Sequence, residues 1–133
     1  MGTTTRASLA AAALLVVAGC TAGPDAGGAA ATAVALAHRV AAGDGAAACR
    51  LLAPTTVERL EHDSGLPCAQ AVLALDLPTT LPGARGESFG RQAQVRSSAD
   101  VVFLVRSGDA WLVTAAGCTP RGDRPYDCDL EGG

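Results

Sequence analysis

An apolar segment close to the N-terminus decides which part of this chain is free to fold. It runs from Ala7 to Ala18 with Ser8 as its one polar residue, and a short polar stretch that contains Arg6 precedes it. A run of this length is typical of the apolar core of a signal peptide, and it is shorter than the roughly 20 residues that a membrane-spanning helix needs. We therefore expect residues 1–19 to be a signal peptide that is removed on export.

The end of this segment resembles the lipobox of bacterial lipoproteins. Small residues precede a cysteine in Val17-Ala18-Gly19-Cys20, although the family usually has leucine where this chain has Val17. The resemblance implies cleavage before Cys20 and a diacylglyceryl group on its sulfur. Two acyl chains would hold the protein stably on the extracytoplasmic face of the cell membrane. The alternative is an ordinary secretory leader followed by a coincidental cysteine.

Export also determines the expected state of the other cysteines. Four of the five cysteines remain when Cys20 is set aside, and an even number in an oxidising compartment favours pairing. Cys49 and Cys68 fall on the apolar faces of two expected helices, whereas Cys118 and Cys128 flank a segment rich in proline and glycine. Three connectivities are open, and of these we predict Cys49–Cys68 with Cys118–Cys128.

The mature chain divides into a tether and one small domain. Residues 20–28 have no apolar periodicity and predict a flexible tether, which leaves residues 29–133 for the domain. Helical spacing dominates the first half of the domain. The expected helices cover 29–42, 46–52, a segment that begins with a capping box at Thr55 and Glu58, and a segment that opens at Pro67. The first helix is expected to bury an apolar arc. A stripe formed by Ala30, Val34, Ala37 and Ala41 lies at its centre, and Leu36 and Val40 widen it.

The second half of the domain changes from helical to alternating spacing. Residues 89–96 alternate between apolar and polar, and fuller apolar runs cover 101–105 and 111–116. Gly108-Asp109 between the last two runs fits a type II′ hairpin turn. The chain therefore predicts an α+β fold in which N-terminal helices pack on a short antiparallel meander.

Three segments of this domain resemble the NTF2-like superfamily. They are a helix end at Ala42-Gly43-Asp44, a helix with Ala48-Cys49-Arg50-Leu51-Leu52-Ala53-Pro54, and a meander closing on Trp111-Leu112-Val113. Over roughly residues 29–118 the chain is similar to small secreted or lipid-anchored members from high-GC bacteria. The resemblance implies a helix-covered, cone-shaped sheet, and commonly dimerisation through the sheet.

Composition excludes several classes of function. The formal net charge of −3 becomes −4 when Arg6 leaves with the leader, so nothing attracts this chain to nucleic acid. All ten basic residues are arginine, and without lysine there can be no Walker A loop, Schiff-base enzyme or Ser-Lys pair. The acidic residues of the tail lack the spacing of a calcium loop. We expect neither a cofactor nor a metal.

Two functions remain from this reading. The first is a non-enzymatic accessory or binding domain, held at the membrane by its lipid, which binds a second copy of itself, another envelope protein or a small apolar ligand. The second is an NTF2-like enzyme of the isomerase or dehydratase type, because such enzymes place polar residues inside the cone. His38 with Asp44 is the one candidate pair for it, and a boundary histidine bonded to backbone or solvent is the simpler interpretation of His38.

The expected hairpin also defines a candidate binding patch. With Gly108-Asp109 as the turn, Arg106 pairs with Trp111, Leu104 with Val113 and Val102 with Ala115, on a face suited to cover the helices. The opposite face would carry four large apolar side chains with no helix left to cover them, at Val101, Phe103, Val105 and Leu112. A contiguous apolar patch suggests a partner, either a second copy or another envelope protein. The alternative is that residues 117–133 fold back over it and Tyr126 caps it.

Overall fold

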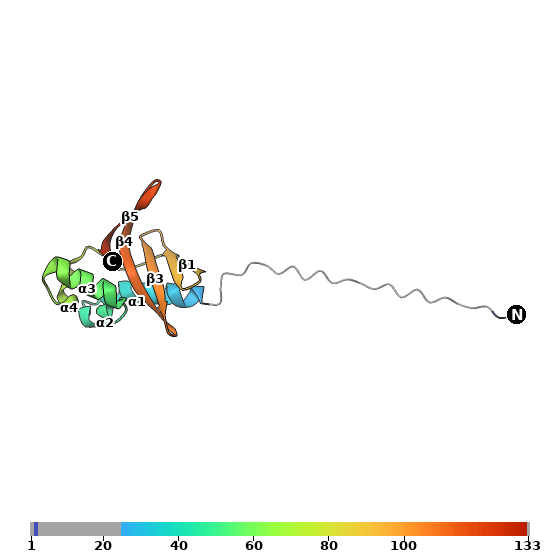
Figure 1. Cartoon of the computed structure of the whole chain (residues 1–133), viewed down its shortest axis with the longest axis horizontal. Helices are drawn as coiled ribbons and strands as arrows, with labels where there is room; N and C mark the ends of the chain where they lie inside the picture. Colours follow the sequence, from blue (N-terminus) through green and yellow to red (C-terminus); the bar gives the residue numbers. More distant parts are fainter. Residues whose placement is uncertain (1, 3–24, 133) are drawn as a thin grey trace.

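Helices come first along the chain and strands follow, which confirms the expected α+β class. The computed structural model describes residue 2 and residues 25–132 (Figure 1). The helices are α1 (Ala26–Ala41), α2 (Gly45–Cys49), α3 (Pro54–Ser64) and α4 (Cys68–Ala74). The strands are β1 (Arg85–Phe89), β2 (Gln92–Arg96), β3 (Val101–Ser107), β4 (Ala110–Arg121) and β5 (Arg124–Glu131). Leader residues 3–19, Cys20 and most of the expected tether lie outside the described residues.

Helix α1 begins three residues earlier than expected and buries a different stripe. Its first turn takes in the end of the segment assigned to the tether, 20–28, because two groups of the sheet hold its start. The indole Nε1 of Trp111 donates to the carbonyl oxygen of Asp25 at 3.1 Å, and Arg106 forms an ion pair with the Asp25 carboxylate. The predicted arc is correct at Leu36 and Ala37 but rotated elsewhere, because alanines on every side of a helix leave its rotation undetermined. The buried residues are Ala26, Ala29, Ala33, Leu36 and Ala37.

The small residues of α1 allow it to lie unusually close to the sheet. A Cβ atom added at Gly86 of β1 would collide with the carbonyl oxygen of Ala26. Glycine at this position therefore permits the contact between helix and strand, which Figure 1 shows where the beginning of α1 (blue) lies beside β1.

The second helix is shorter than predicted. It ends at Cys49 rather than Leu52, because the chain is drawn into an extended pairing with β4. The amide of Ala53 donates to the carbonyl of Val113 at 2.8 Å, and the amide of Val113 donates to the carbonyl of Leu51, also at 2.8 Å. Two sheet-like hydrogen bonds thus replace the last helical turn.

The capping box predicted at Thr55 and Glu58 is absent. Helix α3 begins with Pro54 in its first turn and Ala53 as its N-cap, without a side-chain capping bond. Proline is well suited to the first helical position, so it displaces the start of the helix by one residue. Thr56 is buried instead, and its hydroxyl donates to the carbonyl of Thr114 at 3.2 Å.

Helix α4 and both disulfides agree with the prediction. Pro67 is the N-cap, and the side chains of Cys68, Ala71 and Val72 are buried. The bond Cys49–Cys68 joins α2 to α4, and Cys118–Cys128 joins β4 to β5. Each half of the fold therefore contains one covalent crosslink.

The five strands form one antiparallel meander in the order β1-β2-β3-β4-β5. The segment 89–96 was expected to be a single strand. It instead contains the last residue of β1, a turn and the whole of β2, because Gly90 adopts a positive φ of 62° and reverses the chain. Alternation continues on both sides of the turn, which is why spacing alone suggested one strand.

The β3–β4 register follows the prediction up to a bulge. Arg106 pairs with Trp111 and Leu104 with Val113, and Gly108 alone takes a positive φ, 58°, as a type II′ turn requires. The predicted pairing of Val102 with Ala115 is wrong, because β4 carries an extra residue there and Ala115 lies opposite Phe103.

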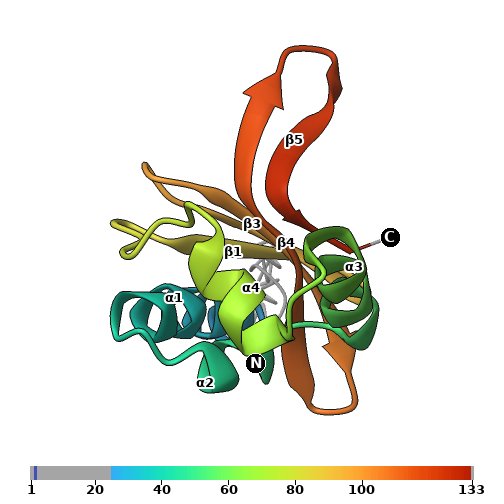
Figure 2. The same cartoon turned by 90° about the vertical axis from the view of Figure 1, so that its left-hand side faces the viewer.

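The tail does not fold back as a flap. Residues 124–131 pair with the long strand β4 as β5, and Figure 2 shows this hairpin projecting beyond the rest of the sheet. The Cys118–Cys128 disulfide crosses the two strands where the projection begins, at a directly opposed pair.

One buried carboxylate fixes the course of β4. Asp100 ends the loop between β2 and β3, is 7% exposed and accepts three backbone N–H groups. Its Oδ1 atom accepts from Val101 at 2.7 Å and from Cys118 at 2.8 Å, and Oδ2 accepts from Gly117 at 2.8 Å. Hydrogen bonds to a charged acceptor contribute more than neutral ones, so this group ties the loop to the base of the projecting hairpin.

We expect Asp100→Asn to lower the free energy of unfolding by about 2–3 kcal/mol. The asparagine side chain has only one acceptor oxygen, and its NH₂ group would face a backbone N–H that now donates to the carboxylate. Urea denaturation of the mature domain measures this. Asp123→Asn, in the exposed turn between β4 and β5, is the matched control and should change the value by less than about 0.5 kcal/mol. Equal stability of the two variants would contradict the role given to Asp100.

Candidate binding surface

The outer face is the face of the sheet opposite α1. The side chains of Val102, Leu104, Trp111 and Val113 point the other way, into the core with α1. Val101, Phe103, Val105 and Leu112 therefore share the outer face, and each of them is half-buried. The structure thus places the four predicted patch residues together without covering them completely.

Two open hollows flank Phe103 on this face. One, of about 480 Å³, is lined by Phe103 and Val105 together with Thr55 of α3 and residues of β1 and β2. The other, of about 450 Å³, lies between Phe103 and β5 and is lined by Tyr126 and Glu131. Val101 and Leu112 lie on the same face beside these hollows. Phe103 therefore stands between two accessible depressions on the middle strand of the sheet.

Tyr126 partly fulfils the capping role considered for it. Its ring meets that of Phe103 edge to face, with 5.3 Å between the ring centroids. The rest of the tail runs beside β4 as a strand, so Tyr126 covers one edge of Phe103 and leaves the remainder open. The contact fixes the orientation of Phe103 more than it hides the ring.

Sequence reasoning did not single out Phe89, the most exposed large apolar side chain of the described residues. It lies at the end of β1, is 65% exposed and lines the larger hollow. The signal that could have identified it is Gly90, since a glycine that interrupts an alternating pattern often marks a turn. A turn there leaves the preceding aromatic residue at a corner of the sheet.

The two edges of the sheet differ in charge. The β1–β2 hairpin has Arg85, Arg91 and Arg96 against Glu87 alone, and all four are exposed. Strand β5 has three exposed acidic residues against one arginine, Arg124. The acidic residues are Asp127, Asp129 and Glu131. The β1–β2 edge of the sheet is therefore basic and the β5 edge acidic, and of the three acidic side chains Glu131 lines the hollow beside Phe103.

The structure does not assemble the candidate enzyme pair. His38 is exposed near the end of α1, and neither His38 nor Asp44 lines any of the hollows found among the described residues. Asp44 instead caps α2 by accepting from the amide of Ala47 at 3.0 Å, and its other oxygen lies 3.7 Å from Arg39. Both residues thus have helix-end surroundings rather than those of an acid–base site.

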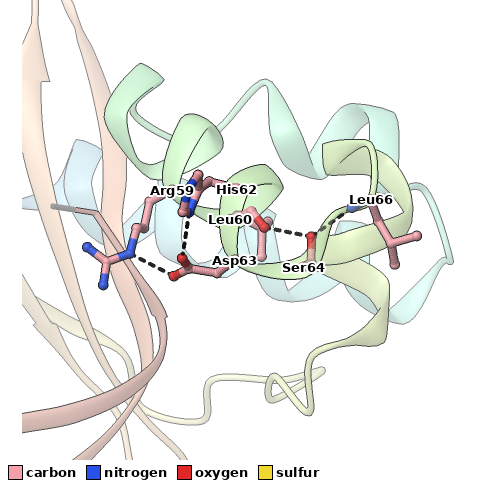
Figure 3. A network of polar contacts seen from close by, with 6 residues as sticks. All are labelled: Arg59, Leu60, His62, Asp63, Ser64 and Leu66. Carbon is pink, nitrogen blue, oxygen red and sulfur yellow. Dashed lines mark hydrogen bonds and ion pairs between the residues drawn. The ribbon is translucent and has the colours of Figure 1, made fainter.

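A second polar group lies at the end of α3 (Figure 3). Arg59 Nε donates to Asp63 at 2.7 Å, and His62 Nδ1 lies 3.1 Å from the other carboxylate oxygen. The hydrogen bond from Arg59, supported by the one with His62, lowers the pKa of Asp63 below its ordinary value. Arg59 and Asp63 border a small cavity of about 270 Å³ between α3 and β5. Because both side chains are exposed, this network adds little stability and supplies no enclosed reaction site.

Searches for other kinds of site and for relatives gave no further assignment. Within residues 25–132 no group of acidic, histidine and cysteine side chains is arranged to hold a metal ion, and no helix of that part is long and apolar enough to cross a membrane. No protein-family model matches the chain, and no curated protein or solved structure is detectably similar to it.

The Asp63 pKa provides a test of the α3 network. We expect Arg59→Ala to raise the pKa of Asp63 toward its ordinary value, because the strongest partner of the carboxylate is lost. A depressed pKa favours the folded state above the unfolded pKa, and that contribution disappears as the pH falls through the folded value. Carboxyl-carbon NMR titration measures the change, with exposed Arg50→Ala as the control that leaves Asp63 unaltered. An unchanged Asp63 midpoint in Arg59→Ala would refute the assignment.

Proposed function

We propose that this protein is an exported lipoprotein whose domain works as a binding module without catalysis of its own. The proposal takes Cys20 as the lipid-bearing residue and the extracytoplasmic face of the cell membrane as the location. One structural observation favours binding over catalysis. The accessible apolar surface gathers around Phe103 on the outer face, while His38 is exposed and lines none of the hollows described above.

We further propose a distant relationship to the NTF2-like superfamily. Helices followed by a meander with a long, bulged final hairpin support it.

The occupant proposed for the outer face is a second copy of this chain. Charge is the argument, since the β1–β2 edge of the sheet is basic and the β5 edge acidic. Two copies related by a two-fold axis along β3, the middle strand, would place the β1–β2 side of each over the β5 side of the other. Phe103 would then lie on or close to the axis, where a self-complementary contact is most strongly desolvated.

The same axis agrees with a lipid anchor on each copy. Rotation about an axis parallel to the strands keeps the two ends of the sheet where they were. Both copies would therefore have the beginning of α1 at the same end, so that both N-terminal segments can reach one membrane. An axis perpendicular to the strands would place the two anchors at opposite ends of the dimer.

The anchor is tested by Cys20→Ala. Without the sulfur the lipid cannot be attached, so the variant should lose lipoprotein processing and leave the membrane fraction. Mass spectrometry of the mature protein, together with membrane fractionation, measures both effects. If wild type and variant have the same mature mass and fractionate alike, the protein is not a lipoprotein.

The dimer is tested by Phe103→Asp in the unlipidated domain. A carboxylate at the centre of the contact should weaken self-association by about 30-fold, equivalent to about 2 kcal/mol, while the domain stays folded. Analytical ultracentrifugation measures the dissociation constant and circular dichroism the fold.

Leu73→Asp is the matched control for this experiment. Leu73 lies on α4 and is 38% exposed, so it offers an apolar-to-acidic change outside the outer face. Equal weakening by both variants, or a wild-type domain that stays monomeric at high concentration, would rule out the outer face as the dimer contact.

A further inference from the structure

The turns of the sheet fall into two groups. In an antiparallel meander successive turns alternate between the two ends. The β1–β2 turn at residues 90–91 and the β3–β4 turn at residues 108–109 therefore lie at one end, named here the anchor end. The loop 97–100 and the projecting β4–β5 turn lie at the other.

Hydrogen bonds attach the beginning of α1 to the anchor end. Arg106 forms an ion pair with Asp25, and Trp111 Nε1 donates to the Asp25 carbonyl. The guanidinium of Arg91 in turn donates to the backbone carbonyl of Arg106 at 2.8 Å, and the backbone amide of Arg106 donates to the backbone carbonyl of Arg91 at 2.7 Å. Asp25 is thereby held near the turn that follows Phe89.

The chain length limits how far this end can lie from a membrane. Cys20 and Asp25 are five positions apart in the sequence. A fully extended segment of that length spans at most about 18 Å. A lipid on Cys20 would therefore keep Asp25, and with it the β1–β2 turn, close to the lipid headgroups.

We propose that Phe89 inserts into the membrane interface and orients the domain. This inference rests on the proposed lipidation of Cys20. Phe89 is 65% exposed at the corner next to the anchor end, where an aromatic ring gains by leaving water for the headgroup boundary. The exposed charges of the two anchor-end turns are Arg91 and Asp109, which nearly cancel, so the apolar side chain supplies the contact. Insertion there would direct the projecting β4–β5 hairpin away from the bilayer.

The experiment attaches the domain to vesicles whether or not the natural lipid is present. Mature protein with Cys20 as its free thiol is coupled to a maleimide lipid, in vesicles of phosphatidylglycerol and brominated phosphatidylcholine. Phe89→Trp carries the probe. Leu66→Trp is the matched control, because Leu66 is 41% exposed beside α3 and α4, on the opposite side of the domain from the beginning of α1 (Figure 1). The emission of buried Trp111, measured in the wild-type protein, is subtracted from both.

Quenching by bromine gives the outcome. Phe89→Trp should lose about half of its added emission, since a ring seated about 5–10 Å into the interface lies against the brominated chains, whereas Leu66→Trp should lose almost none. Equal quenching at both positions would overturn the proposal. A blue-shifted but unquenched Trp at position 89 would overturn it in favour of a protein contact. Mass spectrometry of the natural protein separately tests lipidation, so failure of the anchor and failure of the insertion are distinguished.

Discussion

The course of β4 depends on the carboxylate of Asp100. That strand bulges opposite Phe103, donates two hydrogen bonds to Asp100 from the amides of Gly117 and Cys118, and continues into the projecting hairpin. Because β4 also contacts both α1 and α3, its direction decides which residues face inward. A charged acceptor suits this task, since it can satisfy three donors at a point where the regular ladder is interrupted. The outer face and the projecting hairpin both follow from this interaction.

The sequence predicted features that have a local physical cause. Helix α4, the Gly108 turn and the cysteine pairs depend on proline, glycine and the phase of nearby residues, and each was recovered. The alanine-rich α1 had its location predicted but not its rotation, because its side chains are too alike to mark one buried stripe. Rotation was decided by distant partners, among them Gly86 and Trp111.

The sequence predicted which residues share the outer face, but it did not predict the hollows on that face. Alternation along β3 placed Val101, Phe103 and Val105 on one side, and the register of the next hairpin followed from its turn. The hollows beside Phe103 depend on the bulge in β4, which no local pattern indicates, and on Tyr126, which the sequence suggested only as a cap over the whole patch. Phe89 was not predicted for a related reason. The alternation of apolar and polar residues continues across Gly90, so it gives no sign that the chain reverses there.

Lipid attachment and a self-complementary face would reinforce each other. Molecules confined to a membrane and oriented alike meet at a high effective concentration, so a weak contact around Phe103 can become populated without a large interface. Insertion of Phe89 would further restrict how each domain is oriented relative to the membrane, because the domain would be held there both by the lipid on Cys20 and by the Phe89 side chain. A domain with a modest core can tolerate an apolar patch under these conditions, provided that the patch is covered by its partner once the molecules share one surface.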